Sequence, residues 1–260
     1  MPAAGNSVAT DRVAVEEPLE IRVRGTAVAV LMRSPGREAD LAAGFLASEG
    51  IVEHAADLSG VEPCVDPGTG LPEANVWNVT LAEGAAFDPR MRRAGVVGSS
   101  CGLCGVQTLA ELEKRVPALV PAPERLPADF LVRGFARMRE EQAVFQETAG
   151  VHAAALLGLD GGWIDLAEDI GRHNAVDKIL GARVRAGDYP VDRPLALLVS
   201  GRISFEIAQK AALAGVVLVA GVSAPTSLAV DAAEDFGQTL YGMVRNGSAN
   251  RYAGRIRIGG

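Results

Sequence analysis

Apolar and polar positions alternate at the start of the chain in the way that half-buried strands require. The segment LEIRVRG (19–25) alternates strictly, and the apolar run TAVAVLM (26–32) follows it after Arg24-Gly25, so the pattern predicts two strands joined by a tight turn. NVWNVTLAE (75–83) predicts a further strand. The stretch from 53 to 72 is rich in turn residues and predicts no element.

A helix is predicted between these strands, in SPGREADLAAGFLASEGIV (34–52). Ser34 is its expected cap, Pro35 its first helical residue and Gly50 its end. Three apolar residues at helical spacing predict one buried face: Leu41, Phe45 and Leu46. A second helix, VQTLAELEKRV (106–116), is predicted directly after a CGLCG segment.

The second half of the chain alternates helices with near-continuous apolar strands, which predicts an α/β layer with a largely parallel sheet. The expected strands are VHAAALL (151–157), WIDLA (163–167), LALLVSG (195–201), VVLVAGV (216–222) and QTLYGMV (238–244). The expected helices span 171–187, 204–215 and 227–237. PALVPAPERLPAD (117–129) is proline-rich and predicts a connection. We therefore expect a tail at 1–12, an N-terminal domain at 13–120 and a C-terminal domain at 121–260.

Three turns in this half follow apolar strands, and ligands of α/β sheets bind beyond the carboxyl ends of strands. In SGRISFE, Gly201 and Arg202 precede a helix whose expected cap is Ser204, which predicts a phosphate cradle or, alternatively, an ordinary turn with a surface arginine. GVSAPTS is a weaker second turn. VRNGSANR carries Arg245 and Arg251 around an Asn-Gly pair, as a hairpin turn or as a basic lip.

Polar residues concentrate in EDIGRHNAVDKILG (168–181), at a predicted loop-to-helix junction. Arg172 and the helix start suit a phosphate, and His173 could move protons. The alternative is a capped surface helix in which Asp177 and Lys178 are solvated charges. His152, within an apolar strand, is more typical of a satisfied core histidine than of a ligand.

Composition narrows the classes of partner. With 260 residues, 48% of them hydrophobic and 22% charged, the chain is globular rather than disordered. Its net charge of −7 excludes general binding of nucleic acid or of anionic membranes, so an anionic ligand needs a local basic pocket. The start has no signal-peptide pattern, and the longest apolar stretch (211–222) is shorter than the roughly 20 residues of a membrane span. A soluble, cytoplasmic protein is expected.

The sharpest chemical feature is the Cys101-Gly-Leu-Cys104 motif. Two such thiols can ligate a metal, cycle between dithiol and disulfide, or carry a sulfur atom, and a helix start just downstream would favour the thiolate. A structural zinc site needs four ligands, of which the motif supplies half. Cys64 has no assigned role. The motif of zinc-dependent nucleobase deaminases is absent, because no glutamate follows His152 at the required spacing.

Taken in order, six segments resemble the FdhD family of formate dehydrogenase accessory proteins over nearly the whole chain: DLAAGFLASEGIV, SSCGLCG, TAGVHAAAL, EDIGRHNAVDKILG, SGRISFEIAQKAALAG and VSAPTSLAVDAAE. The resemblance implies an α/β (overall α+β) protein, with a small β-rich N-terminal domain. It also implies a C-terminal three-layer domain that is similar to cytidine deaminase but lacks its zinc ligands.

The resemblance also implies a function: a sulfurtransferase that takes persulfide sulfur from a cysteine desulfurase. The sulfur passes to the molybdenum cofactor, Mo-bis(molybdopterin guanine dinucleotide), for insertion into formate dehydrogenase. Cys101 would carry the persulfide and Cys104 would assist, and the protein would form a homodimer and bind no metal directly. The alternative is a zinc- or guanine-nucleotide-binding accessory module with a structural CxxC.

One cofactor-binding segment of the family aligns with Met243, Val244, Arg245, Asn246, Gly247 and Ser248. In some members it ends in arginine, where this chain has Ser248. The residues alone add Arg172, His173, Gly201 and Arg202 to the expected cofactor site, because guanidinium groups and helix starts suit diphosphates.

Overall fold

The computed structural model describes residues 10–87, 96–97 and 115–259. A five-stranded sheet of order β3-β4-β1-β2-β5 comprises β1 (Glu17–Val23), β2 (Thr26–Arg33), β3 (Leu58–Val65), β4 (Pro72–Leu81) and β5 (Val96–Val97). A six-stranded sheet of order β12-β11-β10-β9-β7-β8 comprises β7 (His152–Gly158), β8 (Trp163–Asp169), β9 (Leu195–Val199), β10 (Leu218–Gly221), β11 (Thr239–Arg245) and β12 (Ser248–Ala253). The short β6 (Arg125–Leu126) and β13 (Arg257–Ile258) pair with each other.

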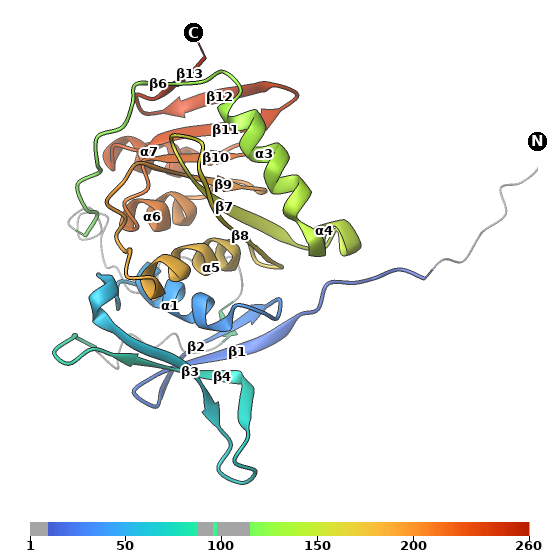
Figure 1. Ribbon diagram of the computed structural model, residues 1–260, viewed down its shortest axis with the longest axis vertical. Coiled ribbons are helices and arrows are strands. Elements are labelled where there is room, and N and C mark those ends of the chain that lie inside the picture. The colour runs from blue at the N-terminus through green and yellow to red at the C-terminus, as the bar shows by residue number, and fades with distance from the viewer. Residues whose placement is uncertain (1–9, 88–95, 98–114, 260) are drawn as a thin grey trace, which may run out of the picture.

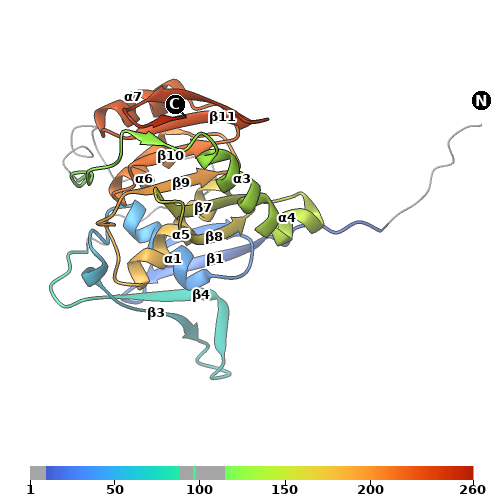
Figure 2. The same ribbon diagram turned by 45° about the horizontal axis from the view of Figure 1, so that its top comes forward.

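The helices lie in layers on and between these sheets (Figures 1 and 2). They are α1 (Glu38–Ser48), α3 (Phe130–Glu141), α4 (Ala143–Thr148), α5 (Arg172–Arg185), α6 (Phe205–Leu213) and α7 (Ser227–Asp235), with a 3-10 turn at Ala55–Asp57. Helix α3 covers one face of the six-stranded sheet, and α5 and α6 cover the other. Helix α1 lies between α5 and the five-stranded sheet. None of the described helices has the length and hydrophobicity needed to cross a membrane.

Strand β7 explains why the strands of the second half are apolar without interruption. Ala153, Ala155 and Leu157 belong to the core cluster beneath α3. Ala154 and Leu156 belong to the cluster shared with α5 and α6. Both faces of the strand are thus covered, as in sheets sandwiched between helices. The second of these clusters continues through α1 to Leu19 and Ile21 of β1, so one core joins both sheets.

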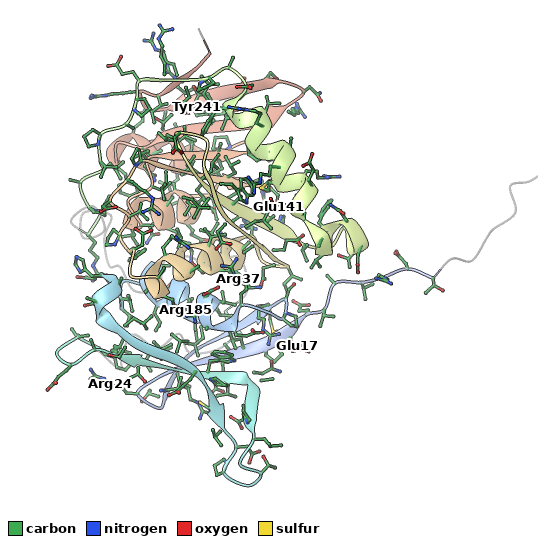
Figure 3. The ribbon with its side chains drawn as sticks, in the orientation of Figure 1. Glu17, Arg24, Arg37, Glu141, Arg185 and Tyr241 are labelled. Atoms are coloured by element: carbon green, nitrogen blue, oxygen red, sulfur yellow. The ribbon has the colours of Figure 1, made fainter. Side chains whose placement is uncertain are left out.

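Two glycines let α1 and α5 approach so closely that their backbones touch. A Cβ on Gly44 of α1 would overlap the carbonyl oxygen of Asp177, and a Cβ on Gly181 of α5 would overlap that of Asp40. Ion pairs surround the crossing: Arg37 bonds Asp165 at 2.7 Å, and Arg185 reaches Asp40. Figure 3 places Arg37 and Arg185 at this junction. The contact fixes the five-stranded sheet relative to α5.

Most of the predicted elements are confirmed, with corrections that have physical reasons. The sheet of the second half is mixed: β9, β10 and β11 are parallel, but β7, β8 and β12 run antiparallel to their neighbours. The stretch 53–72, expected to hold only turns, contains β3, whose half-exposed residues hide its alternation. The domain boundary near residue 120 and the tail at 1–12 stay predictions.

The N-terminus of α1 differs from its prediction as well. The helix begins at Glu38 after Arg37, which has a left-handed backbone with φ of 63°, so neither Ser34 nor Pro35 starts it. The hydroxyl of Ser34 instead accepts a bond from the backbone N–H of Ile170. Gly50, at φ of +72°, does end the helix. The helix is buried on every side rather than on one face, because it lies between a sheet and another helix.

Candidate functional site

Strands β9, β10 and β11 end at the same edge of the six-stranded sheet, since they are parallel. The turns after them stay in contact: Val222 N–H bonds Val199 O at 3.3 Å, and Met243 N–H bonds Ser223 O at 3.2 Å. Because β7 is antiparallel to β9, its first residue, His152, lies at this edge too. The structure thus brings the three turns together at one edge of the sheet, as predicted.

A cavity of about 740 Å³ opens at this edge, between the strand ends and the helices α3 and α4. The sheet contributes His152, Ser200, Val222 and Asn246 to its wall. The helical side contributes three apolar or aromatic side chains and two polar ones: Phe135, Met138, Phe145, Arg139 and Gln142. The volume is in the range of small-molecule sites, which span roughly 300–1,000 Å³.

Gly201 lies against the ring of His152 and beside Arg172. A Cβ at Gly201 would lie 3.4 Å from His152 Nδ1 and 3.7 Å from Arg172 Cδ. Burial lowers the pKa of His152, and the nearby Arg172 and His173 lower it further, while Asp169 acts in the opposite direction. The imidazole of His152 is therefore neutral at pH 7 and offers one hydrogen-bond donor and one acceptor.

His173 is tied to the start of α6. Its Nε2 lies 2.7 Å from Glu206 Oε2 and 3.2 Å from Ser204 Oγ. The hydrogen bond from His173 is the main reason that the pKa of Glu206 is lowered. Ser204 occupies the predicted N-cap position of α6, but its side chain does not cap the helix and contacts His173 instead.

The polar residues of the segment 168–181 divide into two groups. Arg172 and His173 lie at the sheet edge, whereas Asp169, Asp177 and Lys178 are almost completely buried. The alternative expectation that Asp177 and Lys178 are solvated surface charges is therefore wrong. Lys178 Nζ donates to Asp169 Oδ2 at 2.8 Å and to the carbonyl of Ser34.

Asp169 anchors the start of α5 to the end of β2. One of its carboxylate oxygens accepts from Gly171 N–H and from the Asn174 amide, and the other from Ser34 N–H and Lys178. The Asn174 amide also donates to the carbonyl of Met32. These bonds fix the helix start that presents Arg172 and His173.

The segment 243–248 forms the end of β11, a turn and the beginning of β12. Asn246 and Gly247 have φ of 51° and 76°, as a tight hairpin turn with Arg245 paired to Ser248 requires, so the hairpin interpretation is confirmed. Val244 is buried under α3. Met243 also has a positive φ, 55°, which is rare for a side chain of its size and is typical of functional sites.

The predicted site residues are thus only partly assembled. Asn246 lines the cavity, and Arg172, His173 and Gly201 lie at the same sheet edge beside His152. Arg202, Arg245, Gly247 and Ser248 are exposed near this edge. Cys101 and Cys104, with the predicted helix 106–116 up to residue 114, lie outside the described residues. Cys64 is on β3, in the other sheet.

Sequence reasoning missed the helical wall of the cavity. The sequence pattern predicts no element over 130–148, although Phe130, Gly134 and Met138 repeat at helical spacing and are buried in α3. His152 is expected to be a satisfied core histidine, but it lines the cavity. Gln142, between α3 and α4, gave no signal because nothing local distinguishes it from a surface glutamine.

These features define a class: an α/β protein in which a mixed sheet carries a ligand-sized cavity at the carboxyl ends of its parallel strands. The chain belongs to the FdhD/NarQ family, whose sequence model matches residues 14–259.

Curated relatives extend over almost the same length. The chain is 46% identical over 258 residues to the sulfur carrier protein FdhD of Anaeromyxobacter dehalogenans strain 2CP-C, an alignment covering 96% of this chain and 89% of the relative. It is 44% identical to the sulfur carrier protein FdhD of Streptomyces coelicolor, with coverage of 97% and 90%. The FdhD of Mycobacterium tuberculosis is 44% identical, with coverage of 95% and 92%.

The fold has a solved counterpart. A putative formate dehydrogenase accessory protein from Desulfotalea psychrophila superposes with a TM-score of 0.71, covering 95% of this chain and 91% of that one. Because the two sequences are only 22% identical, this likeness establishes the shared fold and nothing about residues.

Proposed function

We propose that this protein is a sulfur carrier for formate dehydrogenase maturation. It takes persulfide sulfur from a cysteine desulfurase on Cys101 and passes it to Mo-bis(molybdopterin guanine dinucleotide). Two findings support the proposal: relatives at 43–47% identity are named sulfur carrier proteins, and the sheet edge offers a cavity of about 740 Å³ with Arg139 in its wall and Arg172 close to its His152. The cavity carries the structural part of the argument.

The loading step is a thiol–persulfide exchange. The Cys101 thiolate attacks the outer sulfur of the persulfide on the desulfurase, a new S–S bond forms on Cys101, and the desulfurase cysteine leaves as a thiolate. The step has no net oxidation or reduction. Cys104 is the nearest thiol in sequence and assists by receiving the sulfur in a second exchange: its thiolate attacks the outer sulfur of the Cys101 persulfide, and Cys101 leaves as a thiolate.

The acceptor cofactor carries diphosphates, which a chain of net charge −7 attracts only through local cations. Arg172 begins α5, and its Nε is buried without a partner among the described residues. Arg202 follows β9 and Arg245 ends β11, the strands on either side of β10, and both residues are exposed. In the proposed function these three guanidinium groups bind the diphosphates, and the backbone at Gly201 and the segment Met243–Ser248 line the approach.

Mass spectrometry tests the loading step directly. Incubation with a cysteine desulfurase and cysteine should add the mass of one sulfur atom to Cys101, reversibly with thiol reductant. Cys101→Ala should remove both this adduct and the maturation of formate dehydrogenase in cells lacking the native protein, whereas Cys64→Ala should leave both intact. Stoichiometric zinc on purified protein with unreactive thiols would contradict the proposal and favour a structural CxxC.

A further inference from the structure

The last strands of the chain expose a group of arginines that we call the arginine patch: Arg125, Arg251, Arg255 and Arg257. Arg125 and Arg257 are directly paired across β6 and β13 (Figure 1), and Arg251 donates to the carbonyl of Arg255 at 3.3 Å, so the four residues lie together. Within the described part of the chain none of the four forms an ion pair, although Arg133 on the neighbouring α3 does. The patch therefore presents charges that the described residues do not neutralise.

Alternation around β13 directs these side chains outward. In the run Arg255-Ile256-Arg257-Ile258, both isoleucines pack on the core beneath α3, and the arginines face solvent. The hydroxyl of Tyr241 holds the same backbone, because it donates to the carbonyl of Ile256 at 3.0 Å and accepts from the N–H of Ile258 at 3.1 Å. The arginines are thus displayed on a fixed backbone.

This arrangement costs free energy unless an anion is present. Like charges at directly paired positions of neighbouring strands repel each other, and Arg125 and Arg257 occupy such positions. Glu124 is next to Arg125 in sequence, and its exposed carboxylate forms no ion pair with the described residues. Four guanidinium groups beside one carboxylate make the patch strongly positive on a chain whose net charge is −7. A negatively charged partner is the simplest account of this concentration.

The surroundings of the patch favour a protein as that partner. The cavities of about 740, 300 and 170 Å³ in the described part of the chain are lined by other residues, whereas small ligands bind in concave sites. Helix α7, which packs against β12, exposes Asp231, Glu234 and Asp235. A long polyanion such as nucleic acid would be repelled by these acids and by the rest of the chain. An acidic protein surface can match the patch alone.

The patch also lies away from the cavity edge of the six-stranded sheet. Strand β12 begins at that edge with Ser248 and ends with Ala253, after which Ile256 N–H bonds Thr239 Oγ1 at 3.2 Å. Thr239 is the first residue of β11, which runs towards the cavity, so β13 follows at the opposite edge. A protein on the patch therefore leaves the cavity open. In the proposed function the client takes the cofactor from the cavity edge, whereas the sulfur donor can dock while the cofactor is bound.

We propose that the arginine patch is the docking surface for the sulfur donor, which meets it with an acidic surface. The inference rests on the proposed function, which supplies the donor as a cysteine desulfurase. Exposed charges of this kind act mainly on the rate at which two proteins associate, and salt screens them. The patch thus brings the desulfurase to the carrier and takes no part in the exchange at Cys101.

Time-resolved mass spectrometry on the full chain compares the loading of Cys101 from two donors. One is a cysteine desulfurase with cysteine, at concentrations where association limits the rate. The other is glutathione persulfide, which transfers its outer sulfur and leaves as glutathione thiolate. Arg255→Gln/Arg257→Gln should slow loading from the desulfurase by about tenfold or more at about 50 mM salt, and by much less at about 300 mM. Loading from glutathione persulfide should stay at the wild-type rate. Arg125→Gln/Arg251→Gln should act in the same way.

Arg12→Gln/Arg24→Gln is the matched control, because it removes the same number of charges from exposed arginines near the start of the chain and in the turn between β1 and β2. It should load from both donors at the wild-type rate. Circular dichroism melts verify that each variant is folded. Equal loading from the desulfurase by the patch and control variants overturns the docking surface. Slower loading of the patch variants from glutathione persulfide overturns it too, since the effect would then lie in the exchange itself.

Two further outcomes would assign the patch to another partner and overturn the inference. Binding of double-stranded DNA that depends on these arginines at about 150 mM salt, with unchanged loading from the desulfurase, would indicate nucleic acid. A changed molar mass of the patch variants in light scattering, with unchanged loading, would indicate a second copy of this chain. Wild-type protein that takes sulfur from neither donor would overturn the proposed function instead.

Discussion

Single buried residues determine how the site is presented, and Asp169 is the strongest example. It is fully buried and receives hydrogen bonds from the loop after β2, from the start of α5 and from Lys178. Lys178 in turn contacts the carbonyls of Ser34 and Glu168. Such a pair contributes less by its own attraction than it costs when one partner is removed, because the other charge then stays buried alone.

Asp169→Asn should therefore lower the free energy of unfolding by about 3–5 kcal/mol, measured by urea denaturation. Glu147→Gln is the control: Glu147 pairs with Arg12, the two side chains are 59% and 72% exposed, and such a pair is worth about 0–1 kcal/mol. Equal losses of unfolding free energy in the two variants would show that the buried Asp169–Lys178 pair is no more important for stability than an exposed pair.

His152 predicts a pH dependence of stability. Its pKa in the folded protein is lowered by burial and by Arg172 and His173, so the unfolded chain binds its proton more readily. The stabilisation is present above the unfolded pKa of about 6.5 and is lost as pH falls through the lower folded value. Wild-type protein should lose more stability than His152→Asn between pH 7 and about pH 5, in parallel urea titrations. If the unfolding free energies of the two proteins fell by the same amount between these pH values, the lowered pKa of His152 would be refuted.

At the scale of elements, the crossing of α1 and α5 is decided by two glycines whose role no local pattern reveals. In a helix, glycine is ordinarily a weak residue, and alanine stabilises it by about 0.5–1 kcal/mol. At Gly44 and Gly181 the opposite holds, because a methyl group would overlap a backbone carbonyl of the facing helix. The close approach also explains why α1 is buried on every side.

Gly44→Ala should destabilise the protein by about 1–3 kcal/mol despite the better helix propensity of alanine. Gly60→Ala in β3, where a Cβ would meet nothing within 4 Å, should change stability by far less. Thermal denaturation of both variants compares the two sites. A stabilised Gly44→Ala variant would contradict the close crossing.

Across the whole molecule, the two sheets share one hydrophobic core. Leu19 and Ile21 of the five-stranded sheet belong to the same buried cluster as Leu156 and Leu197 of the six-stranded sheet, with α1 and α5 between them. A core of this kind couples the unfolding of its parts. We therefore expect the segments 13–120 and 121–260 to unfold together in one transition, even though they are expected to form separate domains.

The two tryptophans test this coupling, since Trp77 lies in β4 and Trp163 in β8. Single-tryptophan variants, Trp77→Phe and Trp163→Phe, should show unfolding transitions by fluorescence that coincide with each other and with circular dichroism. Two separate midpoints would mean that the sheets unfold independently and that the predicted domains are real units of stability.

The sequence alone determined the elements whose signals lie within short stretches of the chain. Strands β7, β9 and β10 are apolar without interruption, and helices α5, α6 and α7 carry plain start and stop signals, so both follow from short-range patterns. The sheet edge with Gly201, Arg172 and Asn246 followed as well, because parallel strands must end together.

Only the tertiary structure decided what depends on contacts between distant segments. Ser34 looks like a helix cap, yet it bonds to Ile170, and Ser204 occupies a cap position but contacts His173. Asp177 and Lys178 look like surface charges, yet partners from α1, α6 and the loop after β2 bury them. Gln142 and His152 line a common cavity only because α3 and α4 pack over the strand ends. A residue's type fixes its chemistry, whereas its partners and its exposure to solvent are fixed by the rest of the fold.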